Sequence, residues 1–373
     1  MVTLLMVDGN ILPQHAQVSA VEQHNSHHHS YPCGAFEGII GCPDARNPGT
    51  VNILALAEHV DRLFRSMEAI GLYRKPERDP CIEPPPEQYC APPIDTNKIL
   101  TCTFSPDEVE TQIISLAEEG LGRGYFDGTQ RLYFRPLAFR GASKRGDLGV
   151  FSLNHPVVLE ISVREWGQYI EGGDKVIEHG ASMLALKQGT DNMGRTNKLC
   201  TNYDEGQRWK NHAMCHGFHE ALLTSTTPAQ EILEGTGENL VVQFKDGTFA
   251  TPDPKNKPIL PGITLDICIQ ILELTGHSVQ RCNIPLERVL ANEIHGGDKI
   301  VTAMGMTGTA AEFTPIGFIQ DETTGKSKRL EIPDVFRQLR QQYLDLVQNK
   351  EVDPRLQDLQ ERVLTPISIP VAV

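Results

Sequence analysis

A lysine, a tyrosine and a glutamate occur in an order and at a spacing that could do chemistry on a carbonyl compound. The stretch Lys-Leu-Cys-Thr-Asn-Tyr begins at Lys198 and ends at Tyr203. Glu234 is the first residue of the glycine-containing segment Glu234–Asn239. A lysine amine forms a Schiff base with an aldehyde, a phenol can hydrogen-bond a ring oxygen, and a carboxylate can keep a pyridine nitrogen protonated. Pyridoxal 5'-phosphate (PLP) needs these three groups, so the order, the spacing and the glycines together point to that cofactor.

The Schiff-base role requires an unprotonated lysine amine. The residues alone do not decide which of two glutamates would face the pyridine nitrogen. A free lysine amine has a pKa of about 10.4, so Lys198 must lose its proton near neutral pH, which burial or a neighbouring cation promotes. Glu238 lies in the same segment as Glu234 and could equally face a pyridine nitrogen. The glycines of this segment allow its backbone to approach a cofactor closely.

A phosphate site is expected at the start of a later helix. Gly262, Ile263 and Thr264 precede an apolar stretch that predicts a helix over 264–274, with Thr264 as its N-cap. Free N–H groups converge at a helix N-terminus and bind phosphate there. We therefore expect the amides of Ile263 and Thr264 and the Thr264 hydroxyl to cradle the phosphate group.

The elements that position these residues follow from periodicity and turn signals. The sequence predicts helices over 58–70, 105–121, 203–217 and 264–274, and from 332 onward. Strands are expected over 4–7, 11–12, 131–140, 157–163, 240–244, 248–251 and 300–304. Alternation along 131–140 places Tyr133 and Arg135 on one face, and Pro136 indicates an edge strand or a bulge. Strands and helices without a regular βαβ rhythm predict two α+β domains.

The chain divides at the break in pattern around Arg164–Gln168. We expect an N-terminal domain over residues 1–162, a linker over 163–172, a PLP-binding domain over 173–330, and a C-terminal helix and tail over 331–373. The stretch 74–98 is rich in proline and charge and is expected to be an irregular surface insertion.

Composition excludes several classes of protein. The chain has 373 residues and a formal net charge of −14, which disfavours binding to nucleic acid or to an anionic membrane surface. The nine cysteines are expected to be reduced thiols in the cytoplasm. Their spacings, such as Cys33/Cys42 and Cys81/Cys90, do not match a zinc motif, so no metal is expected. The first residues predict a strand rather than a signal peptide.

Seven blocks of sequence carry a resemblance to a known family. They are Phe36–Ile39, His59–Leu63, Tyr133–Leu137, Lys198–Tyr203, Glu234–Asn239, Leu260–Thr264 and Gly308–Glu312. In this order they resemble the branched-chain aminotransferase type of the fold-type IV PLP enzymes, over roughly residues 1–320. The resemblance implies a small N-terminal α/β domain and a larger C-terminal α/β domain with a barrel-like sheet.

The resemblance also implies roles for particular residues. Lys198 matches the Schiff-base lysine, Tyr203 the ligand of the ring oxygen, and Glu234, rather than Glu238, the partner of the pyridine nitrogen. Arg62 and Thr309 match phosphate ligands, although Arg62 lies off the apolar face of its helix, as a solvated arginine would. The implied substrate-binding residues are Tyr31, Phe36, Gly38, Tyr133, Arg135, Thr309 and Ala310.

The chain also departs from the family pattern. Cys200 and Thr201 stand where small residues are common, Ile40 replaces a frequent basic residue, and the 74–98 insertion and the tail are extensions. These departures affect the expected substrate rather than the expected cofactor.

The function expected from these observations is amino-group transfer. A Lys198 Schiff base would serve exchange between a branched-chain or other apolar L-amino acid and 2-oxoglutarate, in branched-chain amino acid biosynthesis, and the resemblance implies a homodimer. Two alternatives stay open. One is another fold-type IV activity, namely a D-amino acid or amine transaminase or an aminodeoxychorismate lyase. The other is a binding protein that kept the fold and lost the chemistry.

Overall fold

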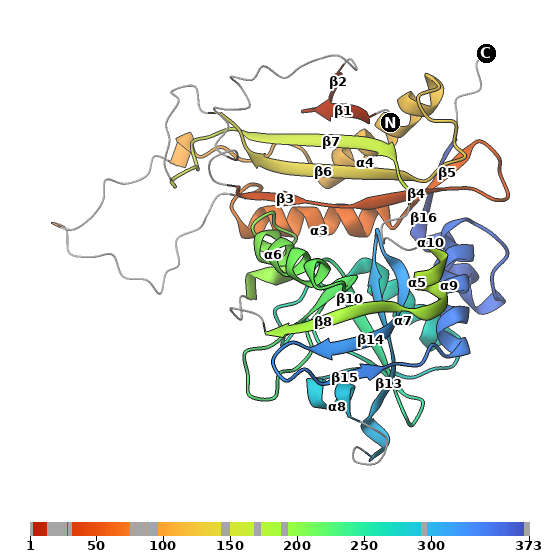
Figure 1. The fold of residues 1–373 in the computed structure, drawn as a ribbon. Helices are drawn as coiled ribbons and strands as arrows, with labels where there is room; N and C mark the ends of the chain where they lie inside the picture. Colours follow the sequence, from red (N-terminus) through yellow and green to blue (C-terminus); the bar gives the residue numbers. More distant parts are fainter. Residues whose placement is uncertain are drawn as a thin grey trace.

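The computed structural model describes residues 3–12, 28, 32–74, 88, 96–142, 150–167, 173–187, 193–291 and 297–368. It contains two eight-stranded sheets with helices packed against them, in agreement with the predicted α+β class (Figure 1). Tyr31, Cys81, Cys90, most of the 74–98 insertion and the end of the predicted linker lie outside the described residues.

The first sheet has the strand order β16-β5-β4-β6-β7-β1-β2, with β3 beside β6. Its strands are β1 (Thr3–Val7), β2 (Asn10–Leu12), β3 (Gly34–Phe36), β4 (Ile39–Pro43), β5 (Thr50–Leu54), β6 (Leu132–Arg140), β7 (Val157–Glu165) and β16 (Leu364–Ser368). Two helices, α3 (Leu56–Ala69) and α4 (Pro106–Gly122), pack on this sheet through one apolar cluster, and a 3₁₀ helix, η2 (Thr96–Lys98), precedes α4.

The second sheet has the order β12-β11-β10-β13-β14-β8-β9, with β15 beside β14. Its strands are β8 (Ala181–Lys187), β9 (Glu220–Thr224), β10 (Asn239–Phe244), β11 (Phe249–Thr251), β12 (Val279–Arg281), β13 (Val301–Gly308), β14 (Glu312–Asp321) and β15 (Ser327–Arg329). The segment 231–234 bonds to β9 on one side and to 284–285, just after β12, on the other. This segment joins the two ends of the sheet and gives it the barrel-like form expected from the resemblance.

Six helices and three 3₁₀ turns complete the described part of the second half. The helices are α5 (Asp174–His179), α6 (Asn202–Cys215), α7 (Ile263–Leu274), α8 (Leu286–Leu290), α9 (Asp334–Val347) and α10 (Gln357–Val363). The turns are η3 (Met193–Thr196), η4 (Gly297–Lys299) and η5 (Pro354–Leu356). None of the helices in the described ranges is long and apolar enough to cross a membrane.

Local signals predicted most of these elements correctly. The α4 helix begins as expected, because the Ser105 hydroxyl accepts from the Glu108 amide and the Glu108 carboxylate accepts from the Ser105 amide in a capping box. The predicted hairpins at Asp8–Gly9 and Asp246–Gly247 join β1 to β2 and β10 to β11. The α3 helix buries Val60 and its apolar neighbours against the first sheet, as its periodicity indicated.

The expectation that Pro136 marks an edge strand or a bulge is wrong, since β6 is not at an edge and its register does not shift at this residue. Strand β6 has neighbours on both sides, with β7 along its full length and β3 and β4 along the other edge. Pro136 lies between the pairs Phe36–Leu137 and Ile39–Phe134, where the partner strand is interrupted. Proline has no N–H to donate, so the sheet tolerates it at the gap between two short strands.

The C-terminal residues return to the first sheet. Strand β16, within the predicted tail, pairs antiparallel with β5, with Leu364 opposite Leu54. At the other predicted boundary, β7 continues to Glu165, three residues into the predicted linker. Residues from both ends of the chain therefore build one sheet, and the domain boundaries given above stay a prediction.

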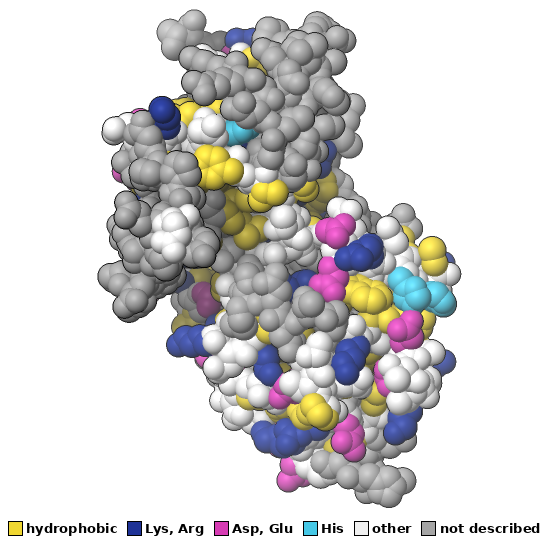
Figure 2. Space-filling view, turned by 90° about the vertical axis from the view of Figure 1, so that its left-hand side faces the viewer, with side chains coloured by type: hydrophobic (Ala, Val, Ile, Leu, Met, Phe, Trp, Pro, Cys, Tyr) yellow, Lys and Arg dark blue, Asp and Glu magenta, His cyan; other side chains and the backbone are white. Residues whose placement is uncertain are grey.

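One apolar cluster joins the two halves. Ile40 and Leu54 of the first sheet pack in the same cluster as Leu265 of α7 and Phe336 and Tyr343 of α9. On the face of the molecule that Figure 2 shows, further hydrophobic side chains lie at the surface where the upper and lower parts meet. This shared core holds α7 and the first sheet next to each other, and the site described below lies between them.

Candidate active site

The predicted Schiff-base lysine is tied by its backbone to the first half of the molecule. The Lys198 amide donates to the Ser66 hydroxyl of α3 at 2.9 Å, and the Lys198 carbonyl accepts from the Phe36 amide at 3.1 Å. The next residues continue this contact, since Cys200 donates to the Gly34 carbonyl at 2.9 Å. The lysine segment therefore runs beside β3, although it directly precedes α6 in the chain.

The lysine amine faces the predicted tyrosine. Lys198 Nζ donates to the Tyr203 hydroxyl at 2.8 Å, because Tyr203 lies in the first turn of α6 and points back toward the lysine. The amine also lies over the Phe36 ring, 5.1 Å from its centroid. Phe36 and Tyr203 in turn make an edge-to-face contact with their centroids 5.0 Å apart. Two of the three predicted groups are thus in direct contact.

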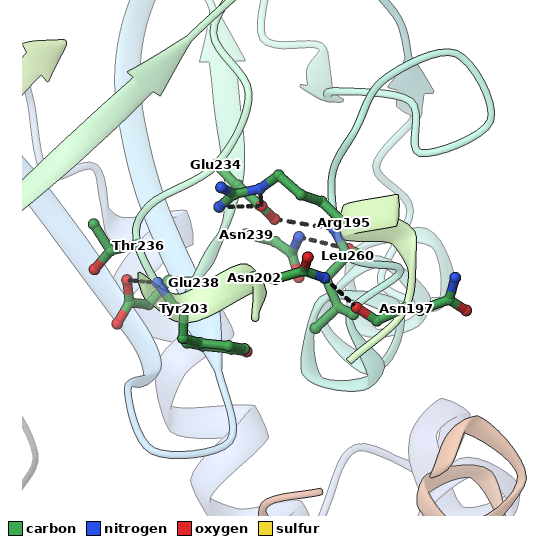
Figure 3. A pocket seen from close by; sticks show the side chains of 10 residues that line it. Arg195, Asn197, Asn202, Tyr203, Glu234, Thr236, Glu238, Asn239 and Leu260 are labelled. Atoms are coloured by element: carbon green, nitrogen blue, oxygen red, sulfur yellow. Dashed lines mark hydrogen bonds and ion pairs between the residues drawn. The ribbon is translucent and has the colours of Figure 1, made fainter. Parts of the chain in front are cut away.

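Glu234 is buried beyond Tyr203 and has two partners. Its Oε2 accepts from the Leu260 amide at 3.0 Å, and its Oε1 lies 3.2 Å from Nη2 of Arg195 (Figure 3). Burial raises the pKa of the Glu234 carboxyl above its usual value, and Arg195 opposes that rise. Nothing in the sequence pattern singled out Arg195, apart from its place three residues before Lys198.

Glu238, the rival carboxylate, has different surroundings. It is buried near Glu220, whose carboxylate pairs with the Lys210 ammonium and accepts from the Thr236 hydroxyl at 2.7 Å. Burial and the neighbouring Glu220 raise the pKa of Glu238 above its ordinary range. The two glutamates therefore differ in their neighbours, since Glu238 lies beside the carboxylate of Glu220 and Glu234 beside the guanidinium of Arg195.

A helix begins where the phosphate cradle is predicted, at the start of α7, with one correction to its N-cap. The helix begins at Ile263, its N-cap is Gly262, and no side chain caps it in the described part of the chain. Thr264 is therefore not the N-cap but the second helical residue, and its side chain is buried. Any side chain at Gly262 would collide with Asn239, so only glycine fits at the start of this helix. The amides of Ile263 and Thr264 are among the N–H groups that have no partner within the helix, because the first intrahelical bond is donated by Asp266.

Arg62 is buried rather than solvated, because a buried carboxylate binds it. Its Nε and Nη2 donate to the two oxygens of Glu37 at 2.7 and 2.8 Å, and its Nη1 donates to the Pro261 carbonyl at 2.9 Å. His59 contacts the same carboxylate at 2.8 Å. Burial alone would raise the pKa of Glu37, but Arg62 and His59 outweigh it and hold the pKa well below its ordinary value.

This arrangement places Arg62 next to the start of α7. Glu37 and His59 stand in two of the sequence blocks that carry the resemblance, and that position was the available signal for them. Their contact is between residues 22 apart in the chain, which local patterns do not reveal.

The turn between β13 and β14 forms the wall of the site on the side of the second sheet. It carries Thr309 and Ala310, and just before it lies the buried Thr307, whose hydroxyl has no hydrogen-bond partner among the described residues. After the turn, Glu312 pairs with Arg131, which precedes β6, and with Arg340 of α9 at 3.0 Å. Through these two ion pairs Glu312 connects the end of the turn to both halves of the molecule.

A cavity of about 650 Å³ lies between these elements. Tyr133 and Arg135 point into it from one face of β6, as predicted, with Arg135 Nη2 donating to the Tyr133 hydroxyl at 2.5 Å. Trp166, from the predicted linker, stacks on Tyr133 with centroids 4.5 Å apart. The predicted site residues that line the cavity are Phe36, Gly38, Tyr133, Arg135, Lys198, Tyr203, Thr309 and Ala310.

Two further observations concern the cavity walls. A side chain at Gly38 would collide with the Tyr133 hydroxyl, so glycine keeps this wall open. Cys200, one of the departures from the family pattern, also lines the cavity, and burial raises the pKa of its thiol. Glu234 lies in an adjoining space of about 20 Å³ whose walls include Tyr203, Thr236 and Glu238, which line the large cavity too.

These residues fit PLP. A lysine amine and a phenol meet in the large cavity, an ionisable carboxylate lies behind the phenol, and uncapped amides open α7. The unpartnered Thr307 hydroxyl is a further polar group suited to a bound anion. Lys198 would hold the aldehyde carbon, Glu234 the ring nitrogen, and Ile263 and Thr264 the phosphate.

Known proteins resemble the chain over most of its length. A family model described as amino-transferase class IV matches residues 47–317. The probable branched-chain-amino-acid aminotransferase of Synechocystis sp. is 24% identical over 331 residues, which cover 88% of this chain and 87% of that protein.

Two solved structures of the T.th. branched-chain amino acid aminotransferase share the fold, each with a TM-score of 0.71 and 97% of both chains covered. One is complexed with N-(5'-phosphopyridoxyl)-L-glutamate and is 25% identical to this chain. The other contains pyridoxamine 5'-phosphate and is 27% identical.

Proposed function

Since the chain belongs to the class IV aminotransferase family and is a PLP-dependent aminotransferase, we propose that it exchanges amino groups between branched-chain or other apolar L-amino acids and 2-oxoglutarate. The observation that carries the proposal is the meeting of the Lys198 amine, the Tyr203 phenol and the Tyr133–Arg135 pair on one cavity of about 650 Å³. A cavity of this size accommodates a cofactor together with a small substrate.

Each residue has a distinct task in this proposal. Bound PLP supplies an electron sink that stabilises negative charge on the substrate's α-carbon. The Lys198 amine would hold the cofactor's aldehyde carbon and would serve as general base and acid toward the substrate's α-proton. Tyr203 orients that amine through the 2.8 Å hydrogen bond. Glu234 would accept a hydrogen bond from the ring nitrogen, and Arg62, Thr309 and the start of α7 would bind the phosphate.

The cavity walls support the choice of substrates. Arg135 offers a guanidinium beside the Phe36 ring, 4.6 Å from its centroid, so a side-chain carboxylate and an apolar side chain could each find a partner there. The T.th. enzyme with a phosphopyridoxyl-L-glutamate group supports glutamate as one member of the exchange pair. Backbone amides of Thr309 and Ala310 would bind the α-carboxylate that both substrates share.

The proposal extends to assembly and location. We propose a homodimer, because Leu100, Val150 and Phe151 are large apolar side chains exposed on the described surface, and two-fold pairing commonly buries such a face. Light scattering at assay concentration tests this, and an active monomer would contradict it. The seven described cysteines are free thiols, which supports a reducing compartment such as the cytoplasm.

An assay with two substrates tests the function. Purified protein with PLP is supplied with 2-oxoglutarate and each of the twenty L-amino acids, and glutamate formation is measured. We expect leucine, isoleucine and valine to give the highest kcat/KM. Turnover of D-amino acids or simple amines in place of L-amino acids, or pyruvate release from aminodeoxychorismate, would identify one of the alternative fold-type IV activities instead.

A further inference from the structure

Arg195 is a buried cation whose side chain lies between two carboxylates. Its side chain is 6% exposed, and Nη2 and Nε lie 3.2 and 3.3 Å from the same oxygen of Glu234. On the other side, Nη1 lies 3.5 Å from a carboxylate oxygen of Glu205 in α6. Arg195 belongs to η3, which leads directly into Lys198, so the Schiff-base segment and the ring-nitrogen carboxylate are linked through this one side chain (Figure 3).

The contacts of Arg195 leave one side of Glu234 available. Both guanidinium nitrogens converge on Oε1, whereas Oε2 accepts one bond, from the Leu260 amide. A carboxylate oxygen can accept two hydrogen bonds, so Oε2 keeps acceptor capacity. The space of about 20 Å³ beside Glu234 can hold one further small polar group.

The charge of Arg195 decides where a shared proton resides. A buried carboxylate without a cation favours its neutral form and would keep a proton that it shares with a pyridine nitrogen. A guanidinium in contact stabilises the ionised carboxylate, so the proton moves from the carboxylate oxygen to the nitrogen. This transfer needs no other reactant, because the same proton and both lone pairs remain within the pair.

We propose that Arg195 is a positioning residue that keeps Glu234 ionised and oriented, so that the proton shared with the cofactor's pyridine nitrogen lies on the nitrogen. The inference rests on the proposed role of Glu234 and acts through it. It explains why a cation is buried at this point of the fold without touching the large cavity.

The protonation state of the ring nitrogen tests the inference directly. PLP labelled with ¹⁵N at the pyridine position is bound to the wild-type protein and to Arg195→Gln, Arg195→Lys and Glu234→Gln, and the ¹⁵N chemical shift is measured at pH 7. We expect the shift of a protonated nitrogen in the wild type and of a neutral one in Arg195→Gln. Loss of an opposite charge in contact shifts a proton equilibrium about 10- to 1,000-fold. Arg195→Lys retains the charge but not the two-nitrogen contact, so an intermediate shift is expected.

Arg208→Gln is the matched control. Arg208 pairs with Asp204 on the exposed face of α6, 3.3 Å apart, and its removal should leave the ¹⁵N shift unchanged. Steady-state kinetics give a second readout, and Arg195→Gln should lower kcat at least about tenfold with a smaller change in KM.

The outcomes separate the inference from the proposed function. If Glu234→Gln keeps a protonated nitrogen, the proposed role of Glu234 is wrong. If Glu234→Gln loses the proton while both Arg195 variants keep the wild-type shift, the inference about Arg195 alone is wrong. Should Arg195→Gln fail to fold, Arg195→Lys decides the matter, with an intermediate shift in support and a wild-type shift against.

Discussion

Lys198 Nζ lies 2.8 Å from the hydroxyl of Tyr203, although the lysine backbone is bonded to β3 and the tyrosine belongs to the first turn of α6. The contact depends on the Ser66 hydroxyl and the Phe36 amide, which hold the lysine segment against the first half of the molecule. A five-residue spacing in the chain therefore becomes a contact only because residues from the other half fix one end of it.

Replacing Lys198 by alanine is expected to remove covalent cofactor attachment and nearly all turnover, since among the described residues no other amine is bonded to the Tyr203 phenol. Borohydride reduction followed by peptide mapping locates the attachment site in the wild type. Label on Lys187 or Lys210, rather than on Lys198, would show that the assignment is wrong.

The choice between the two glutamates is tested by a matched pair of amide variants. Glu234→Gln should still bind PLP but lose most of its rate, by several kcal/mol, because an amide does not stabilise a protonated ring nitrogen. Glu238→Gln should keep a rate within roughly tenfold of wild type, since its partner is Glu220. Steady-state kcat values decide the choice, and the reverse order would transfer the role to Glu238.

Gly38→Ala is expected to impair substrate binding more than folding. Its methyl group would meet the Tyr133 hydroxyl and displace it from Arg135. We expect the KM for glutamate to rise by about tenfold or more, with a smaller change in melting temperature. Gly167→Ala is the control, because a methyl group there meets no atom within 4 Å. An unchanged KM in Gly38→Ala would show that the Tyr133–Arg135 pair does not bind substrate.

Glu37→Gln tests the buried ion pair with Arg62. The substitution leaves the guanidinium buried without its carboxylate, which typically costs about 3–5 kcal/mol of unfolding free energy. Urea denaturation of the cofactor-free protein measures the loss. Glu68→Gln removes a partner of Arg74 from an exposed pair and should change stability by less than about 0.5 kcal/mol. Equal effects of the two substitutions would rule out a structural role for the buried pair.

The Glu220–Glu238 pair makes stability depend on pH. Burial and Glu220 raise the pKa of Glu238 in the folded state above its ordinary value of 4.5. The folded protein therefore holds a proton that the unfolded chain releases, and the stability this proton contributes is fully present below pH 4.5. It declines as the pH rises from 4.5 through the raised pKa. Denaturation of wild type and Glu238→Gln at several pH values should show a smaller decline in the variant, and parallel curves would contradict the shift.

The elements with strong local signals were predictable from the sequence. The capping box at Ser105, the Asp246–Gly247 hairpin and the alternation of Tyr133 and Arg135 each depend on residues within a few positions of one another. Local geometry determines such features, so local patterns reveal them. The start of α7 was also predictable from local signals. Its N-cap is Gly262, two residues before the predicted Thr264, and errors of this size are common at helix ends.

Contacts between distant segments were not predictable. The partner of Arg62 is 25 residues away, that of Glu234 is Arg195 at 39 residues, and β16 pairs with β5 across most of the chain. Such contacts depend on how the elements pack, and periodicity carries no information about packing partners. For Arg62 the helical pattern fitted a solvated side chain equally well, and only the structure shows it buried against the carboxylate of Glu37.

The pairing of β16 with β5 has a consequence for biosynthesis. Strand β5 and the other strands of its sheet, β16 excepted, emerge from the ribosome early, but Leu364–Ser368 follow only after the whole second half has been made. Until then β5 presents an unpaired edge, which is a template for pairing with other chains. The edge of the first sheet at β5 is therefore covered only when β16 has been synthesised. Loss of β16 would mainly cause newly made protein to aggregate, rather than remove catalytic residues.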